Sequence, residues 1–293
     1  MLNQFSQYIS RIPSELFYRI NLIRHASKLP VLCAQDQSIV DAVRREGVFV
    51  TSLEDLGLTK TPTLIEAAKN ELIKMEVVRC ARGDRTSKFG SVENPAYPQI
   101  FTVTDLPEFY SWGSQQCLLN IVENYIGLPI AFQGVHLRRD FANEEPVTTE
   151  LWHLDAEDRR MIKVIIYQDD VSEDNGPFEY IPKSKVSLPL ALRIRSKIAS
   201  RMAMGKVGIN DAEMEEFVPR SFWKPCPGPA GTVVFADPKA IFHHGKPRKQ
   251  KRSALFFVYT AKNPLRPDCC KQYSDQTFSR LLPTQQNSGV GAG

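Results

Sequence analysis

The sequence lacks the features that mark membrane-spanning and nucleic-acid-binding proteins. Its longest uninterrupted apolar runs, such as ALFFVY at 254–259, are the length of a strand and too short to cross a bilayer. The formal net charge is only +4, and much of the excess lies in KPRKQKR at 246–252. A charge this small gives no reason to expect a nucleic-acid partner. We therefore expect neither a membrane span nor bound nucleic acid.

Cysteine spacing excludes two further classes. None of the six cysteines forms a C-x-x-C motif, and the only close pair, Cys269 and Cys270, is adjacent in sequence. This pattern is neither a zinc ribbon nor a disulfide framework, so we expect reduced thiols in a cytoplasmic protein. The N-terminal MLNQFSQYISRIPSELF is interrupted by polar residues too often for the apolar region of a signal peptide.

The first half of the chain reads mostly as helix. Residues 62–79 begin with proline and place apolar side chains near one face, and residues 114–126 repeat this pattern with Cys117 among the apolar positions. Residues 46–53 are a short strand candidate. Residues 82–100, rich in polar residues, glycine and proline, predict a loop.

From about residue 130 the pattern changes to strands. The predicted segments are IAFQGVHLRR, TTELWHLD, MIKVIIYQDD, PFEYIP, GTVVFADP and RSALFFVYT. Because the strands do not alternate regularly with helices, a parallel doubly wound sheet is disfavoured and an α+β protein around a sandwich or barrel is expected. We expect one domain over 1–293, with core strands at about 130–262, a helical N-terminal half, a lid-like insertion at about 185–222 and a frayed tail at 287–293.

The stretch LWHLDAEDRR at 151–160 contains the first candidate site. Residues two apart in a strand point to the same side, so His153 and Asp155 can reach one point together. Alone, the pair does not distinguish a metal-binding edge from half of an acid–base couple or a surface turn, and an isolated H-x-D is common by chance. His243 and His244, which follow a later strand, offer a third ligand. Two histidines and one carboxylate form the facial triad of non-haem iron(II) oxygenases.

Arg252 adds the observation that favours this chemistry. It begins the segment RSALFFVYT, shortly after the two histidines. An iron site that uses 2-oxoglutarate needs a cation for the distal carboxylate, and arginine suits this role because its planar fork makes two parallel hydrogen bonds.

The order of H-x-D, DNGPFEYIP and GTVVFADPKAIFHHG followed by arginine resembles the phytanoyl-CoA dioxygenase family, most clearly over about residues 130–262. The resemblance implies a double-stranded β-helix (jelly-roll) core with helices packed on one sheet. It also implies an iron(II)-dependent oxidation that consumes O2 and converts 2-oxoglutarate to succinate and CO2. Carried over to this chain, it makes His153, Asp155 and His243 the iron ligands and Arg252 the 2-oxoglutarate anchor.

The chain departs from the family at Gly245, where many relatives carry a serine or threonine that helps to hold the cosubstrate. Lys163 and Tyr167 are the candidate replacement donors, because they share strand parity with Ile165, which we assign to the barrel interior. A lysine that snorkels at the sheet edge is the alternative for Lys163.

Three smaller predictions concern neighbouring residues. His243 and His244 point in opposite directions if the segment is extended, and the resemblance favours His243 as the ligand. His136 and Arg138 alternate in FQGVHLRRD, so both can face the interior and meet a substrate, with a salt bridge at the sheet edge as the alternative for Arg138. The basic residues between 246 and 251 are expected to form a solvated turn.

Three functions remain open at this stage. The favoured one is an oxygenase that hydroxylates a C–H bond of a small organic substrate, because Asp155 fills the coordination position that a halide would need. Desaturation, epoxidation and ring formation would use the same ligands. A non-catalytic jelly-roll protein that binds a small ligand and a zinc hydrolase are the alternatives, and neither explains Arg252. The substrate can be a natural product, a lipid-like acid or a carrier-bound intermediate, and the oligomeric state is open.

Overall fold

The computed structural model describes residues 2–82, 97–143 and 145–280. Two antiparallel sheets form its centre, a six-stranded sheet in the order β1-β7-β4-β9-β3-β2 and a three-stranded sheet in the order β6-β5-β8. The strands are β1 (Val48–Ser52), β2 (Gln99–Thr102), β3 (Ile130–Asp140), β4 (Met161–Tyr167), β5 (Phe178–Tyr180), β6 (Lys224–Pro225), β7 (Thr232–Ala236), β8 (His243–Gly245) and β9 (Arg252–Ala261). This is the predicted α+β, double-stranded β-helix fold.

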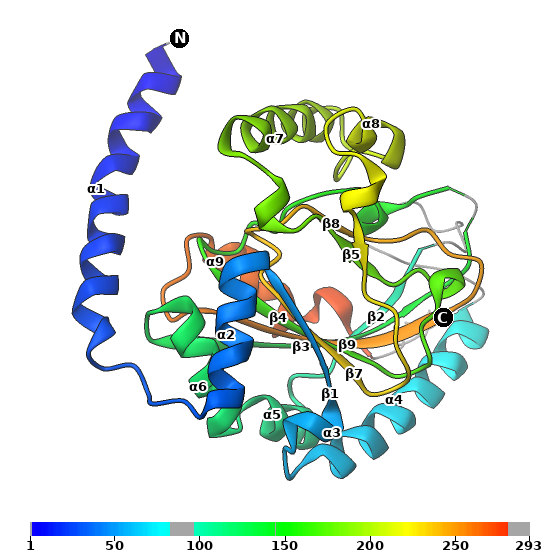
Figure 1. Cartoon of the computed structure of the whole chain (residues 1–293). Helices are drawn as coiled ribbons and strands as arrows, with labels where there is room; N and C mark the ends of the chain where they lie inside the picture. The colour runs from blue at the N-terminus through cyan, green and yellow to red at the C-terminus, as the bar shows by residue number, and fades with distance from the viewer. Residues whose placement is uncertain (1, 83–96, 144, 281–293) are drawn as a thin grey trace, which may run out of the picture.

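Helices cover one face of the six-stranded sheet (Figure 1). The α-helices are α1 (Leu2–Ala26), α2 (Ala34–Glu46), α3 (Leu53–Leu56), α4 (Thr61–Arg82), α5 (Pro107–Gly113), α6 (Gln116–Ile126), α7 (Leu188–Ala203), α8 (Asp211–Glu215) and α9 (Pro267–Cys270). Apolar side chains of α2, α4, α5 and α6 pack against Val164, Phe235 and Phe257 of the sheet in the largest core cluster. In the part of the chain that the structure describes, no helix combines the length and apolar character needed to cross a bilayer.

The opposite face of the six-stranded sheet looks toward the three-stranded sheet. Strand residues two apart share a face, and Ile165, Tyr167 and Ala254 pack here against Phe178 and Tyr180 of β5. The prediction that Ile165 and Tyr167 face the interior is therefore confirmed. This inner face carries the polar residues of the site described below.

The segment 185–222 forms α7, α8 and connecting turns, and these lie over β5 and β8 (Figure 1). Its apolar side chains join a separate cluster that includes Trp152, Ile194, Ile209 and Phe242. The insertion thus packs on the outer side of the small sheet and reaches the residue that precedes His153.

The structure differs from the sequence predictions at residues 148–155 and at Cys117. Residues 148–155 do not form the predicted strand: Thr148–Glu150 is a 3-10 turn, and only Trp152 and His153 make isolated β-bridges. Cys117, predicted on the apolar face of α6, is exposed, because its thiol faces Asp36 at the surface. Most of the predicted loop 82–100 and the tail 287–293 lie outside the described residues.

Candidate metal centre

Three side chains from two distant parts of the chain converge on the inner face. His153, Asp155 and His243 each offer a ligand atom, and these atoms all lie within 4.8 Å of one another. Asp155 Oδ1 is 3.6 Å from His153 Nε2 and 3.8 Å from His243 Nε2. All three side chains are largely shielded from solvent. The structure therefore brings together the residues that the sequence singled out.

The hydrogen bonds of both imidazoles leave the same nitrogen available to a metal. His153 Nδ1 lies 2.7 Å from the carbonyl oxygen of Leu151, and His243 Nδ1 lies 3.3 Å from that of Ile241. Because a carbonyl only accepts, each Nδ1 carries the proton and each Nε2 presents a lone pair toward Asp155. Burial lowers the pKa of His153 and of His243, which favours the neutral form that binds metals.

Backbone bonds hold the two histidines side by side. The amide of His153 donates to the carbonyl of His243 at 3.0 Å, and the amide of His243 donates back at 3.2 Å. The Asp155 amide donates to the carbonyl of Pro238 at 3.0 Å, which fixes the carboxylate beside the pair. The isolated β-bridge between His153 and His243 replaces the predicted full strand. His153 and Asp155 therefore still point to the same side, although residues 148–155 do not form a strand.

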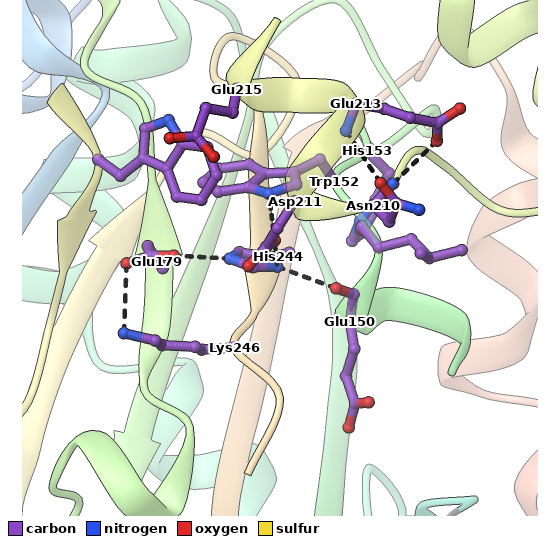
Figure 2. Close-up of polar contacts among 12 residues, drawn as sticks. Glu150, Trp152, His153, Glu179, Asn210, Asp211, Glu213, Glu215, His244 and Lys246 are labelled. Atoms are coloured by element: carbon purple, nitrogen blue, oxygen red, sulfur yellow. Dashed lines mark hydrogen bonds and ion pairs between the residues drawn. The ribbon is translucent and has the colours of Figure 1, made fainter. Parts of the chain in front are cut away.

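His244 points away from this centre, as the alternation along β8 requires. Its Nδ1 lies 2.9 Å from the carbonyl oxygen of Glu150 and its Nε2 lies 2.8 Å from the Glu179 carboxylate (Figure 2). The ring stacks on Trp152 with 3.9 Å between centroids. Trp152 in turn donates from Nε1 to Asp211 of α8 at 2.8 Å. His244 and Trp152 thus pack behind the two histidines that face Asp155.

Lys163 reaches the centre from β4. Its Nζ lies 2.5 Å from Asp155 Oδ2 and 3.8 Å from Glu157 Oε1. Burial alone would lower the pKa of this ammonium, but the Asp155 and Glu157 carboxylates outweigh burial and hold it well above its usual value. Lys163 is therefore a charged interior residue, and the snorkelling alternative is wrong.

Arg252 lies at the other end of the inner face. Its Nη2 donates to Asp140 Oδ2 at 2.9 Å and its Nη1 donates to the carbonyl of Gly176. Asp140 also pairs with Arg248 at 2.9 Å and with Arg138 at 2.6 Å. Although burial raises the pKa of Asp140, the three guanidinium groups outweigh burial and hold it well below its usual range.

In the basic segment 246–251, Lys249 and Lys251 are exposed as predicted, but Arg248 is not part of a solvated turn. Arg248 is only 2% exposed and also pairs with Glu150 at 3.0 Å. Its charge is retained inside the protein because two buried carboxylates lie against it. Burial lowers the pKa of Arg248 to about 10, which still leaves the guanidinium charged at neutral pH.

The space beside Gly245 is occupied by arginine. A Cβ at this position would lie 3.1 Å from Arg248 Nη2 and 3.2 Å from Arg252 Nη2. Glycine is therefore the residue that admits both guanidinium groups next to β8. A side chain at position 245 would require these guanidinium groups to shift by a few tenths of an ångström.

Tyr167 does not have the free hydroxyl that its predicted role requires. Its hydroxyl donates to the carbonyl of Cys226 at 2.9 Å and accepts from the amide of Phe178 at 3.1 Å. The proton is already used, so the donor role predicted for Tyr167 is corrected to a bridge between β4 and the small sheet.

His136 and Arg138 face the interior as predicted, but both have partners within the protein. His136 Nε2 lies 2.9 Å from the carbonyl oxygen of Gln272, and its ring contacts Tyr273 and Phe278. Burial lowers the pKa of His136 to about 4. Arg138 is held by Asp140, so the salt bridge describes its position better than a free substrate contact.

Sequence reasoning missed the acidic residues that hold these cations. Asp140 ends β3, and Glu157 follows Asp155 in the charged stretch AEDRR at 156–160. Tyr273, far along the chain in the C-terminal segment, donates to Glu157 at 2.6 Å. The one available signal was the parity of Asp140 with His136 and Arg138.

Comparison with known proteins decides the family. The sequence model of the phytanoyl-CoA dioxygenase family matches residues 44–253. This range includes His153, Asp155, His243 and Arg252. The chain belongs to the phytanoyl-CoA dioxygenase family. It is accordingly a member of a family of iron(II)- and 2-oxoglutarate-dependent oxygenases, and the non-catalytic alternative is set aside.

Solved structures support the same fold. AviO1 from Streptomyces viridochromogenes Tue57 is 17% identical, with a TM-score of 0.52 over 80% of this chain and 98% of its own. The 2-oxoglutarate-dependent epimerase SnoN from nogalamycin biosynthesis is 14% identical, with a TM-score of 0.52 over 89% and 92%. EctD from S. alaskensis, solved with 2-oxoglutarate and 5-hydroxyectoine, is 16% identical, with a TM-score of 0.51 over 85% and 84%. At such identities the likeness shows the fold alone. No curated protein matches the chain.

Proposed function

We propose that this oxygenase binds iron(II) through His153, Asp155 and His243 and hydroxylates a C–H bond of a small organic substrate while 2-oxoglutarate is converted to succinate and CO2. The observation that carries the proposal is the convergence of two unprotonated Nε2 atoms and one carboxylate oxygen within 4.8 Å. Two imidazoles and a carboxylate are the donor set of non-haem iron(II) oxygenases, and they leave three coordination positions open.

The buried cations fit a cosubstrate carboxylate. His243 and Gly245 lie two residues apart on β8 and share a face, which separates them by about 7 Å. That distance is roughly the reach of a five-carbon dicarboxylate from the metal to Arg252. Among the described residues, Arg252 Nε is buried without a hydrogen-bond acceptor. A carboxylate is the acceptor that a buried guanidinium prefers.

Each residue of the site then has a distinct role. Arg252 holds the distal carboxylate, with Asp140 fixing the direction of its fork. The buried histidines and Asp155 hold the iron, which supplies the oxidising chemistry when O2 is bound. Since a carboxylate fills the third protein position, no place is left there for a halide. Hydroxylation is therefore preferred over halogenation.

The substrate is proposed to enter from the side of the inner face that remains partly accessible. Phe256 and Arg138 are only partly buried although both lie on this face. An apolar ring beside an anchored arginine suits a small organic molecule that carries a polar group. This description covers a natural product and a lipid-like acid equally.

The test is succinate formation by purified protein supplied with iron(II), 2-oxoglutarate and O2. We expect turnover by the wild type and none by Asp155→Ala, while the matched control Asp174→Ala, which changes an exposed carboxylate, should behave as wild type. Manganese(II) binding, measured separately, should be lost in Asp155→Ala and retained in the control. Unchanged metal affinity in Asp155→Ala would overturn the ligand assignment even if the enzyme class stands.

A further inference from the structure

The two oxygens of Asp155 have different partners. Oδ1 faces His153 Nε2 at 3.6 Å and His243 Nε2 at 3.8 Å, whereas Oδ2 lies 2.5 Å from Lys163 Nζ. One oxygen is thus directed to the histidine pair and the other to an ammonium. A carboxylate held this way offers a metal a single oxygen.

The ammonium of Lys163 also lies near a second carboxylate. Glu157 Oε1 lies 3.8 Å from Nζ and accepts a hydrogen bond from the Tyr273 hydroxyl. The side chain is 18% exposed, and its strand neighbours Ala236 and Val258 are apolar. These neighbours offer the ammonium no acceptor, and the Tyr273 ring faces it at 6.0 Å, so Asp155 and Glu157 are the acidic groups that hold it.

We propose that Lys163 is a positioning residue that keeps Asp155 a one-oxygen ligand and weakens binding of the bare metal ion. The inference rests on the proposed function, because it takes Asp155 as an iron ligand. It differs from the expectation that Lys163 contacts 2-oxoglutarate, because it places the action of the lysine on the metal ligand.

Lys163 has two opposing effects on the affinity of the site for a metal ion. By orienting the carboxylate through their ion pair, Lys163 favours the metal by about tenfold, roughly the contribution of one charge-assisted contact. By adding a positive charge within a few ångströms of a divalent cation, it disfavours the metal more than a hundredfold at an effective dielectric constant of about 20. Repulsion is the larger effect. Removal of the ammonium should therefore tighten metal binding.

The same charge has a second consequence for anions. With Lys163 present, the metal and the ammonium together keep surplus positive charge at the centre, and this attracts a dianionic cosubstrate. A one-oxygen carboxylate also leaves the remaining coordination positions open for that cosubstrate. Lys163 thus lowers the affinity for the metal ion alone and raises the affinity of the metal-loaded protein for 2-oxoglutarate.

The experiment measures manganese(II) binding alone, in tag-free, metal-free full-length protein, by the electron paramagnetic resonance signal of the free ion. Lys163→Met keeps the length of the side chain and removes its charge, and Lys163→Arg restores the charge. The matched control is Lys246→Met, because Lys246 pairs with Glu173 and Glu179 on the other side of β8. Thermal unfolding of each variant reports whether the fold is retained.

We expect Lys163→Met to bind manganese(II) at least about tenfold more tightly than wild type, and Lys163→Arg and Lys246→Met to stay within about threefold of wild type. 2-Oxoglutarate should bind the manganese-loaded Lys163→Met protein more weakly. Unchanged or weaker manganese binding by folded Lys163→Met overturns the inference. If Lys163→Met does not fold, Lys163→Gln is measured against the same criterion. Failure of the wild type itself to bind manganese(II) overturns the proposed function instead.

Discussion

Replacement of Arg252 tests the cosubstrate anchor most directly. Arg252→Met keeps the aliphatic stem and removes the fork that would receive the distal carboxylate. A charge-assisted bidentate contact in a shielded site contributes about 1.5–3 kcal/mol, so affinity for 2-oxoglutarate should fall roughly tenfold to a hundredfold. Arg252→Lys should recover only part of this loss, because lysine keeps the charge but not the fork.

The fold should tolerate this change better than most losses of a buried ion. Removing one partner of a buried pair typically costs about 3–5 kcal/mol because a lone charge remains. Here Asp140 keeps Arg138 at 2.6 Å and Arg248 at 2.9 Å after Arg252 is lost. The carboxylate therefore remains paired, and we expect a folded variant with a smaller decrease in the free energy of unfolding.

The assay compares two ligands by calorimetry on manganese-loaded protein without oxygen. 2-Oxovalerate carries a methyl group where 2-oxoglutarate carries its distal carboxylate, so it makes the same contacts at the metal end. Arg252→Met should lower the affinity for 2-oxoglutarate and leave that for 2-oxovalerate unchanged. Equal losses for both ligands would refute the anchor role, since they would indicate a general disturbance of the pocket.

Three further predictions follow from the structure. His243→Ala should lose manganese(II) binding and keep its fold. His244→Ala should keep metal binding and lose about 1–3 kcal/mol of unfolding free energy in urea, because the buried contacts of His244 to Glu150 and Glu179 are removed; the reverse pattern would exchange the two roles. Between pH 6.5 and about 4, His136 is protonated in the unfolded chain but not in the folded protein. The free energy of unfolding should therefore decrease by up to about 3 kcal/mol as the pH is lowered through this range. His136→Gln should flatten this decline in urea titrations, and an unchanged slope would refute the assignment. Gly245→Ser should weaken 2-oxoglutarate binding measured by calorimetry, since its Cβ would press on the Arg252 guanidinium, and unchanged affinity would show that this packing is not needed.

Local sequence predicted most of the strands and, together with the family resemblance, the three converging side chains. Near-continuous apolar runs predicted β4, β7 and β9, because a strand between two packed layers needs apolar side chains on both faces. The spacing of His153 and Asp155 predicted that both side chains reach one point. Alternation along β8 likewise separated His243 from His244. Each of these strand positions and side-chain directions depends on residues that are close in sequence, so the sequence pattern can predict it.

Tertiary structure alone decided how the buried charges are distributed. Arg248 lies in a run of basic residues that looks solvated, yet the fold brings Asp140 and Glu150 against it and compensates its charge. The sequence made Lys163 a candidate cosubstrate donor, and only the fold shows that its Nζ lies 2.5 Å from Asp155 and 3.8 Å from Glu157. A buried ion is stable only where a partner of opposite charge reaches it, and such partners come from segments far apart in the sequence. The pairing is therefore set by the way the two sheets close on each other, and local periodicity contains no information about it.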